Sequence, residues 1–99
     1  MEIIKTQDGS KTTFTLEGRL DTSTAPKLQE ALIPTFDEAK EVKLDFAKLA
    51  YVSSAGLRVL LMGQKAAKAK GGIMTLADVS NEIMEVFEMT GFDNMLSFE

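Results

Sequence analysis

The chain has 99 residues, of which 44% are hydrophobic and 26% are charged, and its formal net charge is −4. This is the length and composition of one soluble globular domain. The chain contains no cysteine and no histidine, which excludes disulfides, thiol nucleophiles, imidazole metal sites and a Ser-His-Asp triad.

Acidic and basic residues are interspersed, so the charge pattern does not predict nucleic-acid binding. The one basic cluster, Lys65, Lys68 and Lys70, falls in the last turns of an expected helix, where cations complement the helix dipole. No apolar run approaches the roughly 20 residues that span a bilayer, and the N-terminus lacks the segments of a secretory signal. We therefore expect a cytoplasmic protein that does not insert into a membrane or bind nucleic acid.

The first expected element is a hairpin over residues 3–17. Ile3 and Ile4 begin one strand, Asp8-Gly9 supplies the turn, and residues 13–16 are β-branched, aromatic or apolar, as in a second strand. Gly18 then breaks the strand pattern.

An amphipathic helix is expected next. Its start offers three polar cap candidates, Asp21, Ser23 and Thr24, followed by Pro26 in the first turn. Apolar residues recur at helical spacing up to residue 32. Pro34 then either ends or kinks this helix.

A short strand is expected over residues 42–46. Asp45 near its end either ties down the following brief loop, which we favour, or touches a partner. The second helix covers residues 57–70 and ends at Gly71-Gly72. Another strand follows over residues 73–76.

Ser80 is expected to cap a third helix, which buries Ile83, Val86 and Phe87 and stops at Gly91. Residues 94–98 add a short strand or a helical turn. The alternation of strands and helices predicts one α/β domain over residues 1–99. We expect a mixed sheet of four to five strands with the helices mainly on one face.

The segment Ser53-Ser54-Ala55-Gly56 precedes the second helix. A serine cap stabilises a helix by about 1 kcal/mol, which explains one serine but not both. Gly56 also needs a reason, because glycine in a first helical turn costs up to about 1 kcal/mol relative to alanine. Either another chain approaches Gly56 closely, or the helix packs tightly against the sheet there.

Two catalytic interpretations of this segment fail. Val52 stands where the first glycine of G-x-S-x-G belongs, and no histidine is present to activate a serine. The phosphate-binding pattern G-x-x-x-x-G-K-[ST] is absent. We therefore expect no catalytic centre and no cofactor.

The stretch VKLDFAKLAYVSSAGLRVLL resembles the signature of the STAS domain, a fold shared by bacterial anti-sigma factor antagonists and the cytoplasmic tails of sulfate transporters. LEGRLDTSTAPKL is similar to the family's Gly-x-Leu-Asp at the first helix. AKGGIMTLADVSNEIMEVFEMTGF is similar to its glycine-led strand and following helix with a Thr-Gly or Ser-Gly stop. These pieces occur in the family's order and cover nearly the whole chain.

The resemblance implies a regulatory binding protein. In that family the serine two residues before the glycine of Gly-Leu, here Ser54, is phosphorylated by an anti-sigma factor with serine-kinase activity. The unmodified protein binds this kinase and frees the sigma factor, whereas the phosphorylated protein is released and is restored by a metal-dependent serine phosphatase. The family usually has Asp before the phosphoacceptor, whereas this chain has Ser53, which is therefore the second candidate.

The resemblance also implies that Asp21 lies beside the phosphoacceptor and contributes to the partner surface, although its carboxylate also suits a helix cap. Arg58, one turn past Ser54, either pairs with the phosphate or is an ordinary exposed residue. The expected partner surface consists of Asp21, Thr22, Ser53, Ala55, Gly56, Arg58, Val59 and Met62.

The second helix has an apolar or small strip about half a turn from its core face. It comprises Val59, Met62, Gly63 and Ala66. The strip either packs against the third helix or extends the partner surface.

Two other functions stay open. One is a constitutive STAS subunit of a membrane transport or lipid-transport complex without a phosphorylation cycle, which Ser53 in place of Asp allows. The other is a small enzyme or nucleotide-binding domain using the space between the serines and Asp21, which no phosphate loop or acid–base pair supports.

Overall fold

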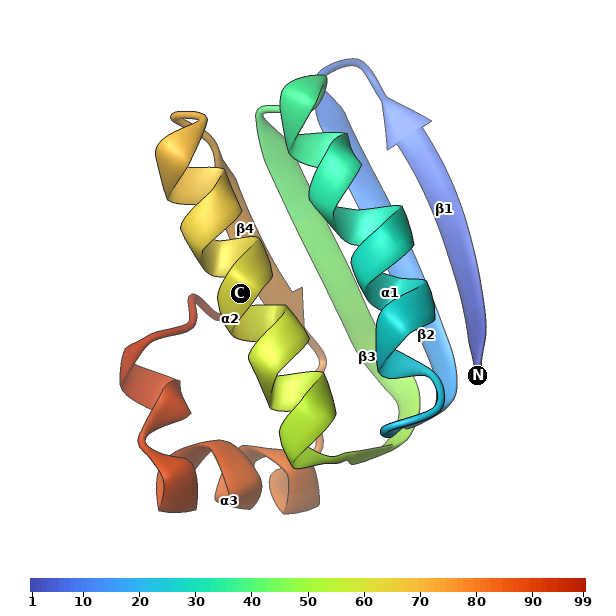
Figure 1. The fold of residues 1–99 in the computed structure, drawn as a ribbon, viewed down its shortest axis with the longest axis vertical. Coiled ribbons are helices and arrows are strands. Elements are labelled where there is room, and N and C mark those ends of the chain that lie inside the picture. Colours follow the sequence, from blue (N-terminus) through green and yellow to red (C-terminus); the bar gives the residue numbers. More distant parts are fainter.

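The computed structural model describes residues 1–99. Its sheet has four strands in the order β1-β2-β3-β4. Strand β1 is antiparallel to β2, whereas β2, β3 and β4 are parallel to one another (Figure 1). The strands are β1 (Glu2–Asp8), β2 (Lys11–Leu20), β3 (Glu41–Val52) and β4 (Ile73–Ala77).

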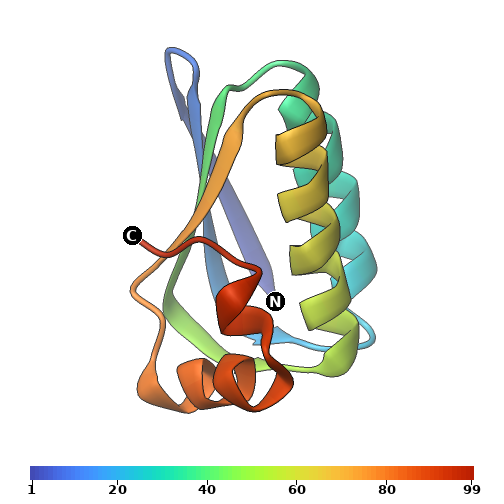
Figure 2. The ribbon, with the colours of Figure 1, turned by 90° about the vertical axis from the view of Figure 1, so that its left-hand side faces the viewer.

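Two of the three α-helices cover one face of this sheet, lying side by side (Figures 1 and 2). The third lies across the end of the sheet at which the parallel strands finish. None of the helices is long and apolar enough to cross a membrane. The helices are α1 (Ala25–Leu32), α2 (Ser54–Ala69) and α3 (Asn81–Thr90), with short 3₁₀ segments η1 (Ile33–Asp37) and η2 (Phe92–Asn94).

The hydrophobic core lies between the sheet and the helices and contains 22 buried residues. In β2 and β3, alternate side chains such as Phe14, Leu16, Val42 and Leu44 are buried, while their neighbours are partly exposed on the opposite face. This two-residue period is what a sheet covered on one face requires. The mixed four-stranded α/β sheet with helices mainly on one face is therefore as predicted.

Several local predictions are confirmed at the ends of elements. Gly9, at φ +64°, lies in the tight turn of the β1–β2 hairpin. The Ser80 hydroxyl accepts a hydrogen bond from the Ile83 amide at 3.2 Å, and Gly91 ends α3 at φ +79°. The α-helix α1 ends at Leu32, two residues before Pro34, and the chain continues as the 3₁₀ segment η1, which contains this proline.

Two strands are longer than predicted. Strand β2 continues through Gly18 to Leu20, and β3 continues past Phe46 to Val52, where a loop was expected. The register between them shifts twice, so β3 carries extra residues. Such bulges interrupt the alternation of buried and exposed residues, which hid the strand in the sequence. The Asp45 carboxylate does bind the backbone that follows it, since it accepts a hydrogen bond from the Ala47 amide at 2.9 Å.

At Gly63 the second apolar strip of α2 packs against α1 and β4, so the alternative in which the strip packs against the third helix is wrong. A Cβ atom added to Gly63 would lie 2.8 Å from the Leu32 side chain and 2.8 Å from the sulfur of Met74. Val59 is only 3% exposed. It belongs to the core, so its assignment to the partner surface is also wrong.

The two edges of the sheet differ. At the β4 edge, the Leu76 amide donates to the Ser97 carbonyl and the Glu99 amide donates to the Leu76 carbonyl, both at 2.9 Å. The C-terminal segment thus covers part of that edge (Figure 2), and Lys43 pairs with Glu99 at 2.9 Å. The β1 edge has no covering segment.

Candidate functional site

The site lies where β2 and β3 end and lead into α1 and α2. Leu20 pairs with Val52 in the last register of the two strands. The Ser53 amide then donates to the Leu20 carbonyl at 2.8 Å. This bond holds the loop over residues 21–24 beside the start of α2, so the structure brings the two predicted segments together (Figure 1).

The two serines occupy different positions at the start of α2. Ser53 is the N-cap, and its hydroxyl accepts from the Gly56 amide at 3.3 Å. Ser54 is the first helical residue and is exposed. No acidic residue lies in the first turn of α2. The positive end of this helix dipole is therefore not complemented by a carboxylate of the helix itself, and one exposed hydroxyl lies beside it.

Gly56 brings α2 against the end of β2. A Cβ atom at this position would lie 2.6 Å from Cγ of Leu20 and 3.1 Å from its carbonyl oxygen. No side chain fits in that space. Of the two explanations for Gly56, tight packing on the sheet within the chain is therefore the one that the geometry supports.

Asp21 organises the loop before α1. One of its carboxylate oxygens, Oδ1, accepts from the Ser23 amide at 3.0 Å, the Ser23 hydroxyl at 2.8 Å and the Thr24 amide at 3.1 Å. The N-cap by position is Thr24, but its hydroxyl turns back to donate to the Arg19 carbonyl at 2.8 Å. Asp21 thus acts ahead of the helix, and its other oxygen, Oδ2, makes no hydrogen bond within the chain.

These contacts change the acidity of Asp21. The hydrogen bond from the Ser23 hydroxyl, opposed by desolvation and reinforced by the Thr24 and Ser23 amides, holds the pKa of the Asp21 carboxyl below its ordinary value. The carboxylate therefore stays charged to a lower pH than an ordinary aspartate does. Asp21 directly follows Leu20, whose carbonyl accepts from the Ser53 amide at the start of α2.

The remaining predicted residues differ in accessibility. Thr22 and Arg58 are exposed, whereas Ala55 and Met62 are half-buried. Arg58 forms no ion pair, since the salt bridges of the chain join other residues. Its guanidinium is thus available on the surface that follows Ser54.

One contact at this end of the sheet was missed in the sequence. The Arg19 guanidinium lies over the Tyr51 ring, 4.2 Å from its centroid, and both side chains are exposed. Their Cα atoms are register partners on β2 and β3. The sequence did not predict this contact because the part of β3 that contains Tyr51 was expected to be a loop.

The site has the features that stabilise a negatively charged group. An exposed hydroxyl stands at a helix N-terminus, where free amides and the dipole stabilise negative charge. Arg58 adds a cation one turn further along the helix. No histidine is available to act as a base toward Ser54.

Comparison with known proteins places this geometry in a family. Residues 4–97 match the family model described as "Mlab, STAS domain". BtrV of Bordetella bronchiseptica, a predicted anti-sigma factor antagonist, is 36% identical over 78 residues, which are 78% of this chain and 67% of that protein. The anti-sigma-B factor antagonist of Bacillus subtilis is 27% identical over 82% of this chain and 74% of its own.

Solved structures agree on the fold. The anti-sigma factor antagonist SpoIIAA in its unphosphorylated form superposes with a TM-score of 0.80 at 15% identity, covering 99% of this chain and 87% of that one. The phosphorylated form of Bacillus SpoIIAA superposes with a TM-score of 0.79 at 16% identity, covering 99% and 91% of the two chains. By its sequence match and its fold, the chain belongs to the STAS domain family.

Proposed function

We propose that this protein is an anti-sigma factor antagonist whose binding to its partner is switched by phosphorylation of Ser54. The relatives named as anti-sigma factor antagonists support the general role. The observation that carries the proposal is that the two serines at the start of α2 have different environments. The Ser53 hydroxyl caps the helix, whereas Ser54 is exposed.

The unmodified protein binds an anti-sigma factor that is also a serine kinase. The contact surface consists of the exposed and half-buried residues of the loop over residues 21–24 and of the first two turns of α2, with Arg58 and Met62 at its far side. The buried Gly56 and Val59 are not part of it. Met62 is a flexible, polarisable contact of the kind found at adaptable interfaces. Binding through this surface presents the Ser54 hydroxyl to the kinase.

Phosphorylation then releases the partner by local electrostatics. A phosphate adds about −1.5 to −2 charge and three acceptor oxygens. The amides at the start of α2, together with Arg58, stabilise this group in the free protein, so the fold is kept. In the complex the same charge lies close to the Asp21 carboxylate and has lost its water, which weakens the interface. A serine phosphatase restores the binding form.

Ser54 is favoured over Ser53 as the acceptor for a physical reason. Phosphorylation of Ser53 replaces the hydroxyl that caps α2 and lies at a half-buried position. Phosphorylation of Ser54 leaves that cap in place and puts the charge in solvent.

The test is the intact mass of the protein purified from its native cells, with fragmentation of the peptide that holds both serines. We expect a fraction heavier by one phosphate, located on Ser54, that is absent in Ser54→Ala and retained in Ser53→Ala. Phosphate found on Ser53 alone would show that Ser53 is the phosphorylated residue, and the proposed phosphorylation switch would then act through Ser53.

Binding supplies the second half of the test. Ser54→Asp is expected to fold like the wild type by circular dichroism and to lose the anti-sigma factor in isothermal titration calorimetry, while Ser54→Ala keeps it. If Ser54→Asp unfolds, the local account of release is wrong.

A constitutive STAS subunit of a transport complex is the second candidate, and Ser53 in place of the family's usual Asp favours it. For this function we expect no phosphate under any growth condition and no effect of Ser54→Asp on partner binding. The same mass and binding measurements therefore separate the two functions.

A further inference from the structure

The β1 edge of the sheet has the properties of a strand-pairing surface. Its seven residues, Glu2–Asp8, pair with β2 without a register shift and contain no proline. None of their backbone groups makes a hydrogen bond outside the β1–β2 ladder. Ile4 is 41% exposed on this strand. A regular edge with unpaired amides and carbonyls is a template for another strand.

The hairpin determines which backbone groups are free. Its loop has two residues, so Asp8 and Lys11 form the hydrogen-bonded pair that closes it. Because the pattern alternates, Ile4 and Thr6 bond to β2, while Ile3 and Lys5 direct their amides and carbonyls away from the sheet.

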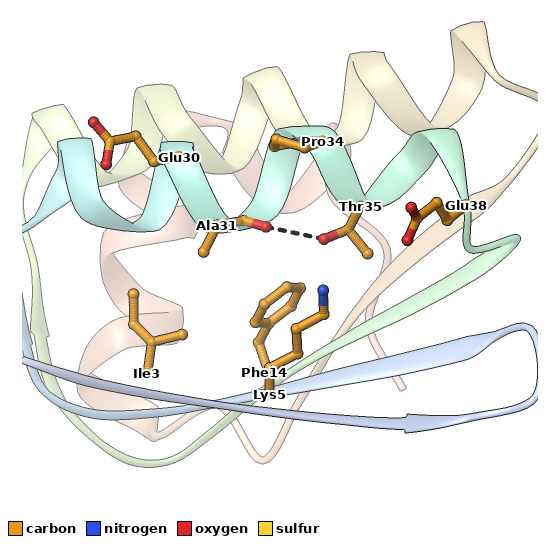
Figure 3. Close-up of a pocket in the computed structure, with 8 residues that line it drawn as sticks. All are labelled: Ile3, Lys5, Phe14, Glu30, Ala31, Pro34, Thr35 and Glu38. Carbon is orange, nitrogen blue, oxygen red and sulfur yellow. Dashed lines mark hydrogen bonds between the residues drawn. The ribbon is translucent and has the colours of Figure 1, made fainter.

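A groove of about 470 Å³ lies between β1 and the first helix (Figure 3). Phe14 forms its floor, and the Lys5 ammonium lies 6.0 Å from the centroid of that ring. Glu38 lies at the Lys5 end of the groove and Glu30 at the Ile3 end, as Figure 3 shows. Neither glutamate belongs to a salt bridge of the chain. Lys5 is the only lysine that lines the groove, and it lies toward the Glu38 end.

We propose that the β1 edge binds a second copy of this chain, with the two β1 strands antiparallel and the two-fold axis passing beside Ile4. In this register Ile4 faces Ile4 of the second copy, and Ile3 pairs with Lys5 of the second copy. That lysine enters the Ile3 end of the groove, where it meets Glu30. By symmetry the contact forms twice, and the two sheets become one sheet of eight strands.

Other registers are less favourable. An axis beside Lys5 sets the two lysines against each other and Glu2 against Asp8, and like charges directly opposite are destabilising. An axis beside Ile3 places Ile4 against Glu2, and an axis beside Thr6 places Ile4 against Asp8. Only the register centred on Ile4 pairs the exposed isoleucines without opposing like charges.

The first test is sedimentation velocity of the full chain from about 10 μM to about 1 mM, a range chosen because a single strand pair is a small interface. We expect a monomer–dimer equilibrium that Ile4→Lys shifts to monomer. Ile73→Lys is the matched control, because Ile73 is 54% exposed on β4 at the opposite edge. A wild type that stays monomeric, or equal losses in both variants, would overturn the proposal.

The ion pair is tested by charge reversal. Lys5→Glu and Glu30→Lys each place two like-charge contacts in the dimer, so each is expected to raise its dissociation constant at least about tenfold. The double variant restores opposite charges and is expected to recover most of the affinity. Single and double variants that dimerise equally well would show that Lys5 does not meet Glu30.

The register is tested by cross-linking, which the absence of native cysteines makes clean. Ile4→Cys places two thiols opposite each other in a close non-hydrogen-bonded pair, within the span of a disulfide. We expect it to form a covalent dimer with oxidised glutathione, whereas Thr6→Cys on the same face of the same strand does not. Cross-linking of Thr6→Cys alone would overturn the register.

Discussion

Helices α2 and α3 start with the same cap. The Ser53 hydroxyl accepts from the Gly56 amide at 3.3 Å, and the Ser80 hydroxyl accepts from the Ile83 amide at 3.2 Å. In both, the serine backbone is extended and the third helical residue supplies the amide. The cap itself therefore does not distinguish a structural helix start from a candidate regulatory one.

The residues after the cap differ. Helix α3 has an acidic residue, Glu82, in its first turn, and the buried Ile83 anchors it in the core. Helix α2 has no acid there, and at the matching positions it has Ala55 and a glycine that lies against Leu20. In α3 a carboxylate in the first turn already complements the helix dipole. The first turn of α2 has no carboxylate, so an anion added there would be stabilised by the dipole.

The largest expected effect comes from filling the space at Gly56. Gly56→Ala forces a methyl group against Leu20, and we expect it to lower the free energy of unfolding by about 2 kcal/mol, in the range of overpacked sites. Urea unfolding measures this. In a Leu20→Ala background the added cost is expected to shrink by at least about 0.5 kcal/mol, because the two sites are coupled. An unchanged cost would mean that Leu20 is not the obstacle.

The next largest effect separates the two serines of α2. Ser53→Ala and Ser80→Ala are each expected to lose about 1 kcal/mol of the free energy of unfolding, because each removes an N-cap. Ser54→Ala is expected to change it by no more than about 0.5 kcal/mol, as for an exposed residue without a structural contact. Equal losses at Ser53 and Ser54 in urea unfolding would break the distinction between cap and free hydroxyl.

A smaller effect compares the two first turns. Ser54→Asp is expected to raise the free energy of unfolding by about 0.3–1 kcal/mol, and Glu82→Gln to lower it by a similar amount, because each changes the charge at a helix N-terminus. Both effects are expected to weaken in about 1 M salt, where charges are screened beyond about 3 Å. A destabilised Ser54→Asp that salt does not restore would show that α2 does not accept an anion there.

The smallest effect concerns the start of α1, where a carboxylate replaces the serine cap. The pKa of Asp21 is lowered in the folded protein, chiefly by the Ser23 hydroxyl. Its contribution to stability is thus full above its ordinary pKa and is lost as the pH falls through the lowered value. We expect the stability difference between wild type and Asp21→Asn to be constant at neutral pH and to shrink as the pH falls below about 4.

Ser23→Ala serves as the control for this pH dependence. This substitution removes the Ser23 hydroxyl, whose hydrogen bond is the largest cause of the lowered pKa. An NMR titration is therefore expected to show the Asp21 carboxyl titrating at higher pH than in the wild type. An identical titration in both proteins would show that the loop contacts do not hold the carboxylate.

The features that could be predicted from the amino-acid sequence are those that depend on neighbouring residues. The hairpin turn at Gly9, the cap at Ser80 and the stop at Gly91 are local, since each involves a backbone conformation or a bond within four residues. The family motifs and the order of strands and helices were visible for the same reason. The mixed α/β sheet with helices mainly on one face follows from that order.

The contacts between distant segments could not be predicted from the sequence and are visible only in the folded chain. The bulges that extend β3 to Val52 depend on pairing with β2, and the burial of Val59 depends on where α1 packs. The role of Gly56 depends on Leu20, 36 positions earlier in the numbering of the chain. Such contacts follow from register and packing, which no stretch of consecutive residues specifies, and the bond from the Ser53 amide to the Leu20 carbonyl is one of them.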